Sequence, residues 1–168
     1  MTVLVLGVVV LLLFGIIDVT TSQGVNAPPS TIAIFGGLSV DATSTLLKGC
    51  ETAAAPPNDI SPAYIVPAGT MAAGAIDWRG SGPGGYDCQR RLYVTAAQGA
   101  VLGFYVDELQ AEGWSVFSRG GGPNGQQQIL LDRSGSDTFQ WVAGITIDAH
   151  SATSTTWTLR FYQNDALD

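Results

Sequence analysis

The strongest constraint on the fold is a series of four segments in the second half of the chain in which apolar and polar side chains alternate. These segments are 114–118, 129–131, 139–148 and 157–162. Alternate side chains of a strand point to opposite faces, so each segment predicts a strand with one buried face. The connections RGGGPNG, DRSGSD and DAHSATST are rich in turn residues and have hairpin length. The sequence therefore predicts an antiparallel sheet with one face under a second layer.

A helix is predicted directly before this sheet, in the stretch TAAQGAVLGFYVDELQAEGW. Thr95 and Gln98 have the spacing of a capping box at its start. The residues that share one apolar face, at i, i+3, i+4 and i+7, are Leu102, Tyr105, Val106 and Leu109. Gly113 and Trp114 predict a Schellman ending in which Trp114 folds back on Leu109. Since the apolar face needs a packing partner, we expect a two-layer domain of helix and sheet.

The chain begins with seventeen residues that carry no charged side chain, MTVLVLGVVVLLLFGII, and Asp18 follows them. As a helix they would be about 25 Å long, close to the ~30 Å hydrocarbon core of a bilayer. A cleaved signal peptide is the alternative, but no basic residue precedes the run, and Pro28 follows the suitable cleavage site. We therefore expect a transmembrane helix. Gly7 and Gly15 lie near one face of it and would let a neighbouring helix approach closely.

These features define an expected fold class and three expected segments. The fold class is α+β, with an N-terminal single transmembrane helix followed by a two-layer domain in which one main helix packs on an antiparallel sheet. Residues 1–20 are the transmembrane anchor, residues 21–59 a stalk and partly irregular segment, and residues 60–168 the extracytoplasmic α+β domain. The stalk is inferred from the polar stretch 18–30, whose double proline is incompatible with a helix.

Cys50 and Cys88 are the only cysteines, and their separation of 38 positions fits neither a metal site nor a Cys-x-x-Cys redox motif. Both lie in glycine- and proline-rich stretches, where a cross-link would limit chain freedom, so we expect a structural disulfide between them. Two buried free thiols are the alternative. Because disulfides persist in oxidising compartments, the bond predicts a single-pass protein of the plasma membrane whose C-terminal domain is extracytoplasmic.

Charge and the types of available ligand exclude several classes of function. Seven basic and fourteen acidic side chains give a net charge of −7 without a basic stripe, so we expect no nucleic-acid partner. The glycine-rich loops lead into strands, whereas a phosphate-binding loop needs a helix directly after it. With a single histidine, His150, and both cysteines in a disulfide, few ligands remain for a transition metal. We expect no cofactor and no metal site.

The sequence contains no recognisable catalytic constellation, so we do not expect an enzyme. His150 lies in a turn rich in serine and threonine, and no Gly-x-Ser-x-Gly elbow accompanies it, which makes a small hydrolase a less favoured alternative. Trp78, Arg79 and Tyr86 are candidate interaction residues of the domain, because aromatic rings beside an arginine suit contact with a protein or glycan. The alternative is that the two rings cover the end of the sheet.

A longer pattern combines a Pro-Gly lead-in with a helix of the form Phe-Tyr-x3-Leu-x3-Gly-Trp and several short antiparallel strands. Its residues are Pro67, Gly69, Phe104, Tyr105, Leu109, Gly113 and Trp114. In this pattern, over about two thirds of its length, the chain resembles small membrane-anchored or secreted bacterial envelope proteins. Its preference for arginine over lysine and its alanine and glycine content suggest an actinobacterial source. The resemblance implies a fold and no activity, because the matching residues form the helix face and its end.

Together these features lead to one expected function and one alternative. We expect a non-enzymatic, membrane-anchored extracytoplasmic accessory or interaction subunit of a larger membrane protein complex. Its expected partners are the lipid bilayer and other integral membrane proteins. The alternative is a binding module for envelope glycan, peptidoglycan or lipid that uses the region of Trp78 and Tyr86.

Overall fold

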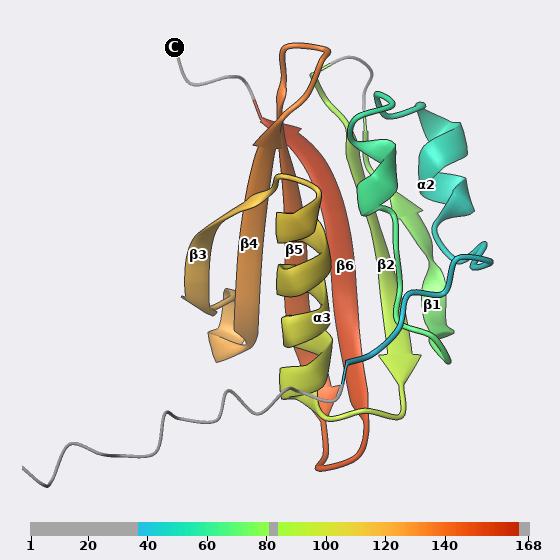
Figure 1. Cartoon of the computed structure of the whole chain (residues 1–168), viewed down its shortest axis with the longest axis vertical. Coiled ribbons are helices and arrows are strands. Elements are labelled where there is room, and N and C mark those ends of the chain that lie inside the picture. Colours follow the sequence, from blue (N-terminus) through green and yellow to red (C-terminus); the bar gives the residue numbers. More distant parts are fainter. Residues whose placement is uncertain (1–36, 81–83, 165–168) are drawn as a thin grey trace, which may run out of the picture. The chain divides into compact units, whose positions relative to one another are not determined.

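The computed structural model describes residues 37–80 and 84–164. In these residues six strands form one antiparallel sheet in the order β1-β2-β6-β5-β4-β3 (Figure 1). The strands are β1 Met71–Trp78, β2 Asp87–Val94, β3 Ser115–Gly121, β4 Gln127–Ser134, β5 Gln140–His150 and β6 Thr155–Asn164. The helices are α2 Lys48–Ala53 and α3 Gln98–Ala111, and two short 3-10 turns are η1 Ser61–Ala63 and η2 Pro123–Gly125. The last strand in the sequence therefore lies in the middle of the sheet.

Strand β6 shows how the alternating sequence produces a sheet with one buried face. Trp157, Leu159 and Phe161 are almost fully buried, whereas the residues between them are only partly buried. Pairing with β2 and β5 on its two sides aligns these apolar residues with the buried residues of its neighbours, for example Phe161 with Cys88 and with Ala143. The buried side chains of the central strands consequently form a single apolar layer.

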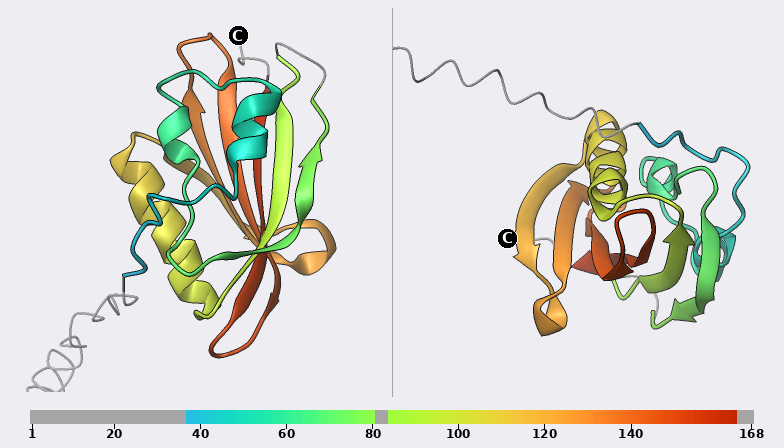
Figure 2. Two further views of the ribbon diagram at one scale, coloured as in Figure 1. Left: turned by 90° about the vertical axis from the view of Figure 1, so that its right-hand side faces the viewer. Right: turned by 90° about the horizontal axis from the view of Figure 1, so that it is seen from below.

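Helix α3 covers this apolar layer and lies on the same side of the sheet as the segment that contains η1 (Figure 2). Its buried residues include all four members of the predicted apolar face: Leu102, Tyr105, Val106 and Leu109. The predicted Schellman ending is confirmed. The amide of Trp114 donates to the carbonyl of Leu109 at 3.0 Å, and the amide of Gly113, at φ +83°, donates to the carbonyl of Gln110 at 3.0 Å.

The start of α3 differs from the predicted capping box. The helix begins at Gln98 with Ala97 as its N-cap, and no side chain caps it. Val94 is still paired with Thr155 in the sheet, and the Thr155 hydroxyl donates a 2.7 Å hydrogen bond to the carbonyl of Ala96. These contacts hold the chain to the sheet through Val94, and a bend at Thr95 and Ala96 follows, so the helix starts later than the sequence suggests.

The described residues before β1 belong to the same apolar core. Their buried members are Leu47, Cys50, Ile60, Ala63 and Val66. A single antiparallel bridge between Val40 and Pro67 joins the two ends of this stretch. Residues 37–59, which the sequence suggests to be stalk and irregular chain, thus contribute α2 and two core residues to the domain.

The expected fold class, α+β with an N-terminal transmembrane helix, is wrong. The described residues are mostly a six-stranded antiparallel sheet with one long helix packed on it. Across residues 37–80 and 84–164, no helix combines the length and the apolar character needed to cross a bilayer. Residues 1–20, with Gly7 and Gly15, lie outside the described residues. The sheet is larger than the four alternating segments predict because β1 and β2 extend it, and β1 is an edge strand whose first five residues are exposed and do not alternate.

Candidate functional site

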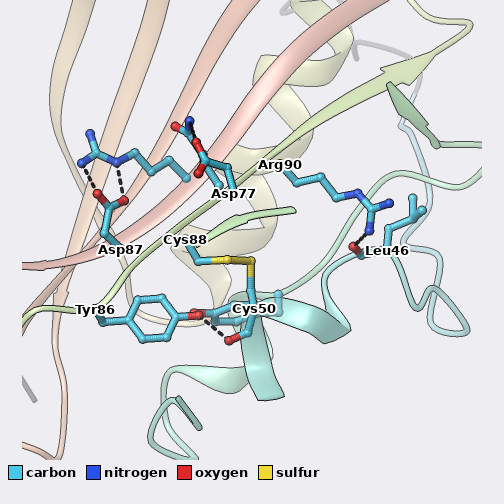
Figure 3. The surroundings of a disulfide bond; sticks show 10 residues. Leu46, Cys50, Asp77, Tyr86, Asp87, Cys88 and Arg90 are labelled. Atoms are coloured by element: carbon cyan, nitrogen blue, oxygen red, sulfur yellow. Dashed lines mark hydrogen bonds and ion pairs between the residues drawn. A yellow bond between two sulfur atoms is a disulfide. The ribbon is translucent and has the colours of Figure 1, made fainter. Parts of the chain in front are cut away.

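The predicted disulfide between Cys50 and Cys88 is confirmed. It joins α2 to β2, with 5.7 Å between the two Cα atoms, and both cysteines are at most 1% exposed (Figure 3). Next to it the Arg90 guanidinium donates a hydrogen bond to the carbonyl of Leu46. The disulfide therefore fixes the segment before β1 onto the sheet from inside the core, where solvent has no direct access to the sulfur atoms.

Tyr86, a predicted interaction residue, is part of the core beside the disulfide. Its hydroxyl donates to the carbonyl of Cys50 at 2.8 Å, and the Tyr64 hydroxyl donates to the Tyr86 oxygen at 2.7 Å (Figure 3). The ring contacts Trp78 edge-on at 4.8 Å and Trp141 at 4.7 Å between centroids. Tyr86 is only 3% exposed, and burial raises its pKa to about 12. This ring does not offer a surface contact, and Trp78 is partly buried against it.

Arg79 lies on the surface, unlike the two aromatic candidates. It forms an ion pair of 2.6 Å with Asp77, which also accepts a 2.9 Å hydrogen bond from the Gln89 amide. The hydrogen bond from Arg79 is the main reason that the pKa of Asp77 lies below its usual value. The three predicted interaction residues therefore do not form one exposed site: Arg79 is exposed, whereas Trp78 is partly buried and Tyr86 is buried.

A different site lies on the sheet face opposite α3, which we call the uncovered face. Polar side chains of β2, β4, β5 and β6 surround a hollow of about 360 Å³ on this face. The polar residues that line it include Gln89, Gln128, Thr146, Asp148, Thr158 and Tyr162. Gly144 lies among them, paired with Leu130 of β4 and Arg160 of β6. Because Gly144 has no side chain, the backbone forms part of the hollow's lining at its position.

Charged groups at the hollow occur in pairs. Arg160 donates two hydrogen bonds to Asp87, at 2.7 and 2.8 Å, and lies 4.5 Å over the ring centre of Tyr162. Asp148 accepts a 2.8 Å bond from the Thr158 hydroxyl and lies 3.1 Å from the Arg91 guanidinium. The bonds to Asp87 raise the pKa of Arg160, and burial raises the pKa of Tyr162. At neutral pH the hollow consequently has paired charges and a neutral phenol.

Sequence reasoning did not find this hollow, although one signal points to it. Gly144 interrupts the apolar run of β5, and a glycine inside a strand often marks a close approach of ligand or backbone. The polar residues around it come from four strands that are far apart in the sequence. Only the pairing of β6 with β2 and β5 brings them together.

The described residues provide no support for metal or hydrolase chemistry. They contain no group of three or more His, Cys, Asp or Glu side chains arranged to hold a metal ion. His150 is exposed at the end of β5, opposite Thr155, and within residues 37–80 and 84–164 it makes no hydrogen bond to a carboxylate. A Ser-His-Asp arrangement requires such an orienting bond.

No family model matches this chain, and no curated protein or solved structure is found to be similar to it. The resemblance to small bacterial envelope proteins therefore stays a prediction.

Proposed function

We propose that this chain is a non-enzymatic binding module of the cell envelope that works on the oxidising, extracytoplasmic side of the plasma membrane. The main observation that supports this proposal is the hollow on the uncovered face. Antiparallel sheets often leave one face to solvent, and such a face needs only polar side chains to stay soluble. Here the face also has a hollow with Gly144 among its lining residues, and charge pairs and amides surround it, which is an arrangement suited to binding.

The disulfide supports the extracytoplasmic location. A structural disulfide between two buried cysteines is typical of proteins that fold in an oxidising compartment and is rare in the cytosol. Location at the plasma membrane depends on the apolar composition of residues 1–17 alone. Together these two features favour a protein that is held at the membrane surface.

Two kinds of partner fit this class of protein. The first is a larger membrane protein complex, to which the domain would be an accessory subunit. The second is a glycan of the envelope. Since the hollow is small and most of its lining residues have polar side chains, it favours the glycan, with a binding surface on the opposite side of the sheet from buried Tyr86.

Photo-crosslinking in intact cells tests the proposal. A photoreactive amino acid is placed at Thr156, on the uncovered face of β6 beside the hollow, and a matched control carries it at Gln110, on the exposed side of α3. We expect an envelope adduct from position 156 and much less from position 110. A protein adduct indicates the accessory subunit, and a protease-resistant adduct indicates the glycan. Equal adducts from both positions, or none, would contradict binding through this face.

A further inference from the structure

We infer that the hollow on the uncovered face binds an uncharged saccharide. This inference rests on the proposed function and names the ligand class of that site. The volume of about 360 Å³ lies at the lower end of the roughly 300–1,000 Å³ typical of small-molecule sites. A few sugar rings of a longer chain fit such a space better than a folded protein surface does.

Charge complementarity at the hollow favours a neutral ligand. Asp87 holds Arg160 through two hydrogen bonds, and Arg91 faces Asp148 at 3.1 Å. A phosphate or carboxylate ligand would have to compete with Asp87 for the guanidinium. A cationic ligand would have to displace Arg91 from Asp148. An uncharged ligand leaves both pairs in place and avoids the cost of burying an unpaired charge.

The hydrogen-bonding groups around the hollow suit a ligand with many hydroxyls. The Thr146 hydroxyl accepts a 2.7 Å bond from Gln128 and keeps its own proton for donation. The Thr158 hydroxyl donates to Asp148 and keeps its lone pairs for acceptance. In the part of the chain that the structure describes, the Tyr162 hydroxyl makes no hydrogen bond. Because each sugar hydroxyl is both a donor and an acceptor, it can match such a mixed lining.

The lining also contains an aromatic ring and a position without a side chain. Tyr162 contributes a ring with a polar tip, and because Arg160 lies over one face of this ring, its edge and its other face remain for the C–H groups of a sugar. A Cβ atom at position 144 would lie 3.3 Å from the Leu130 side chain, so a residue larger than Gly144 would occupy the hollow. The absence of a side chain at Gly144 is thus what keeps this space open.

Binding is measured by NMR on the full chain, kept in a zwitterionic detergent without a sugar headgroup. The probes are maltotriose, mannotriose and N-acetylchitotriose at millimolar concentration. We expect at least one of them to shift the side-chain amide signals of Gln89 and Gln128 and the backbone signal of Gly144. If none of the three shifts these signals, the inference is overturned, whereas photo-crosslinking of a protein from Thr156 would still support the proposed function.

Two sets of variants test whether the hollow is the site. Gly144→Val fills the hollow with a residue that favours strands, and we expect it to abolish the shifts. Thr158→Val removes a lining hydroxyl and should weaken binding about fivefold. Thr156→Val, the same change two residues earlier and outside the hollow, should alter affinity by less than about twofold. Undiminished binding by Gly144→Val would overturn the inference, and if that variant does not fold, the two threonine variants decide.

Discussion

The Tyr86 hydroxyl donates a 2.8 Å hydrogen bond to the carbonyl oxygen of Cys50, 36 positions earlier in the sequence. The same phenol oxygen accepts a bond from Tyr64, and the next but one residue, Cys88, forms the disulfide with Cys50. One covalent bond and one hydrogen bond thus connect the same short helix to the start of β2. The segment before the sheet depends on both.

Loss of the hydrogen-bonded phenol should be costly. Tyr86→Phe leaves the Cys50 carbonyl without its donor and the Tyr64 hydroxyl without its acceptor, and we expect a loss of about 1–3 kcal/mol in the free energy of unfolding. Chemical denaturation of the variant and the native protein, both with the disulfide intact, measures this difference in the free energy of unfolding. Tyr93→Phe, in strand β2 that follows Tyr86, is the matched control and should change the free energy by no more than about 0.5 kcal/mol. Equal effects of the two variants would show that the Tyr86 bonds contribute little.

Removal of the disulfide should destabilise the domain, because the unfolded chain is then less restricted. For Cys50→Ala combined with Cys88→Ala we expect a loss of about 3–4 kcal/mol, the value of the chain-entropy model for a loop of this size. Denaturant titration of the double variant and of the native protein gives the difference. In addition, native protein should resist thiol alkylation until it is unfolded and reduced, because the two sulfur atoms are bonded to each other and their burial keeps a reductant from reaching them.

Alkaline pH should unfold the protein in a window set by its buried tyrosines. The phenol of an unfolded tyrosine has a pKa of about 10, burial raises the pKa of Tyr86 to about 12, and burial also raises the pKa of Tyr64 and Tyr105. The folded state therefore favours the neutral phenols. Their contribution is complete below pH ~10 and is lost as the pH rises through the folded values. Phenolate absorbance should rise together with the loss of tertiary structure, and early ionisation in a still folded protein would contradict this.

The glycine that ends α3 should tolerate no ordinary side chain at low cost. Gly113 has φ +83°, and no neighbouring atom lies within 4 Å of the place that a Cβ atom would take, so strain alone decides the effect of a substitution. We expect Gly113→Ala to cost about 1–2 kcal/mol. Gly120→Ala is the control, since Gly120 also has open space but lies in β3 without positive φ, and it should be neutral or slightly stabilising. Thermal unfolding of both variants gives the comparison.

The period of apolar residues is sufficient to predict the long helix and the last strands. Leu102 and Leu109 at helical spacing, and Trp157 and Phe161 at strand spacing, are all buried as the pattern requires. The start of α3 could not be predicted, because the contact of Thr155 with Ala96 is made by a residue 59 positions away. Local sequence contains no information about such a contact.

Strand β1 and the hollow could not be predicted from the sequence, for two different reasons. The sequence of β1, MAAGAIDW, starts with exposed Met71 and four small exposed residues, and its pairing with β2 is interrupted by a register shift between Ala72 and Ile76. It therefore lacks an alternating pattern. The hollow forms only when the pairing register of four strands brings its lining residues together. Within a single strand, Gly144 is the one residue of the sequence that indicates it. Tyr86 resembles a surface residue because its glycine-rich surroundings are typical of a loop, whereas its burial comes from Trp78 and Trp141.

The central position of β6 determines when this domain can be completed during synthesis. Until residues 155–164 have emerged, β2 has no neighbour on one side. The β1-β2 pair and the β3-β4-β5 strands therefore cannot yet join into a continuous sheet. Cys50 and Cys88 are already available at that stage and are not yet enclosed. An oxidase that acts on the growing chain can therefore join them before the sheet closes, and a chain released without its final strand would have a formed disulfide but no stable fold.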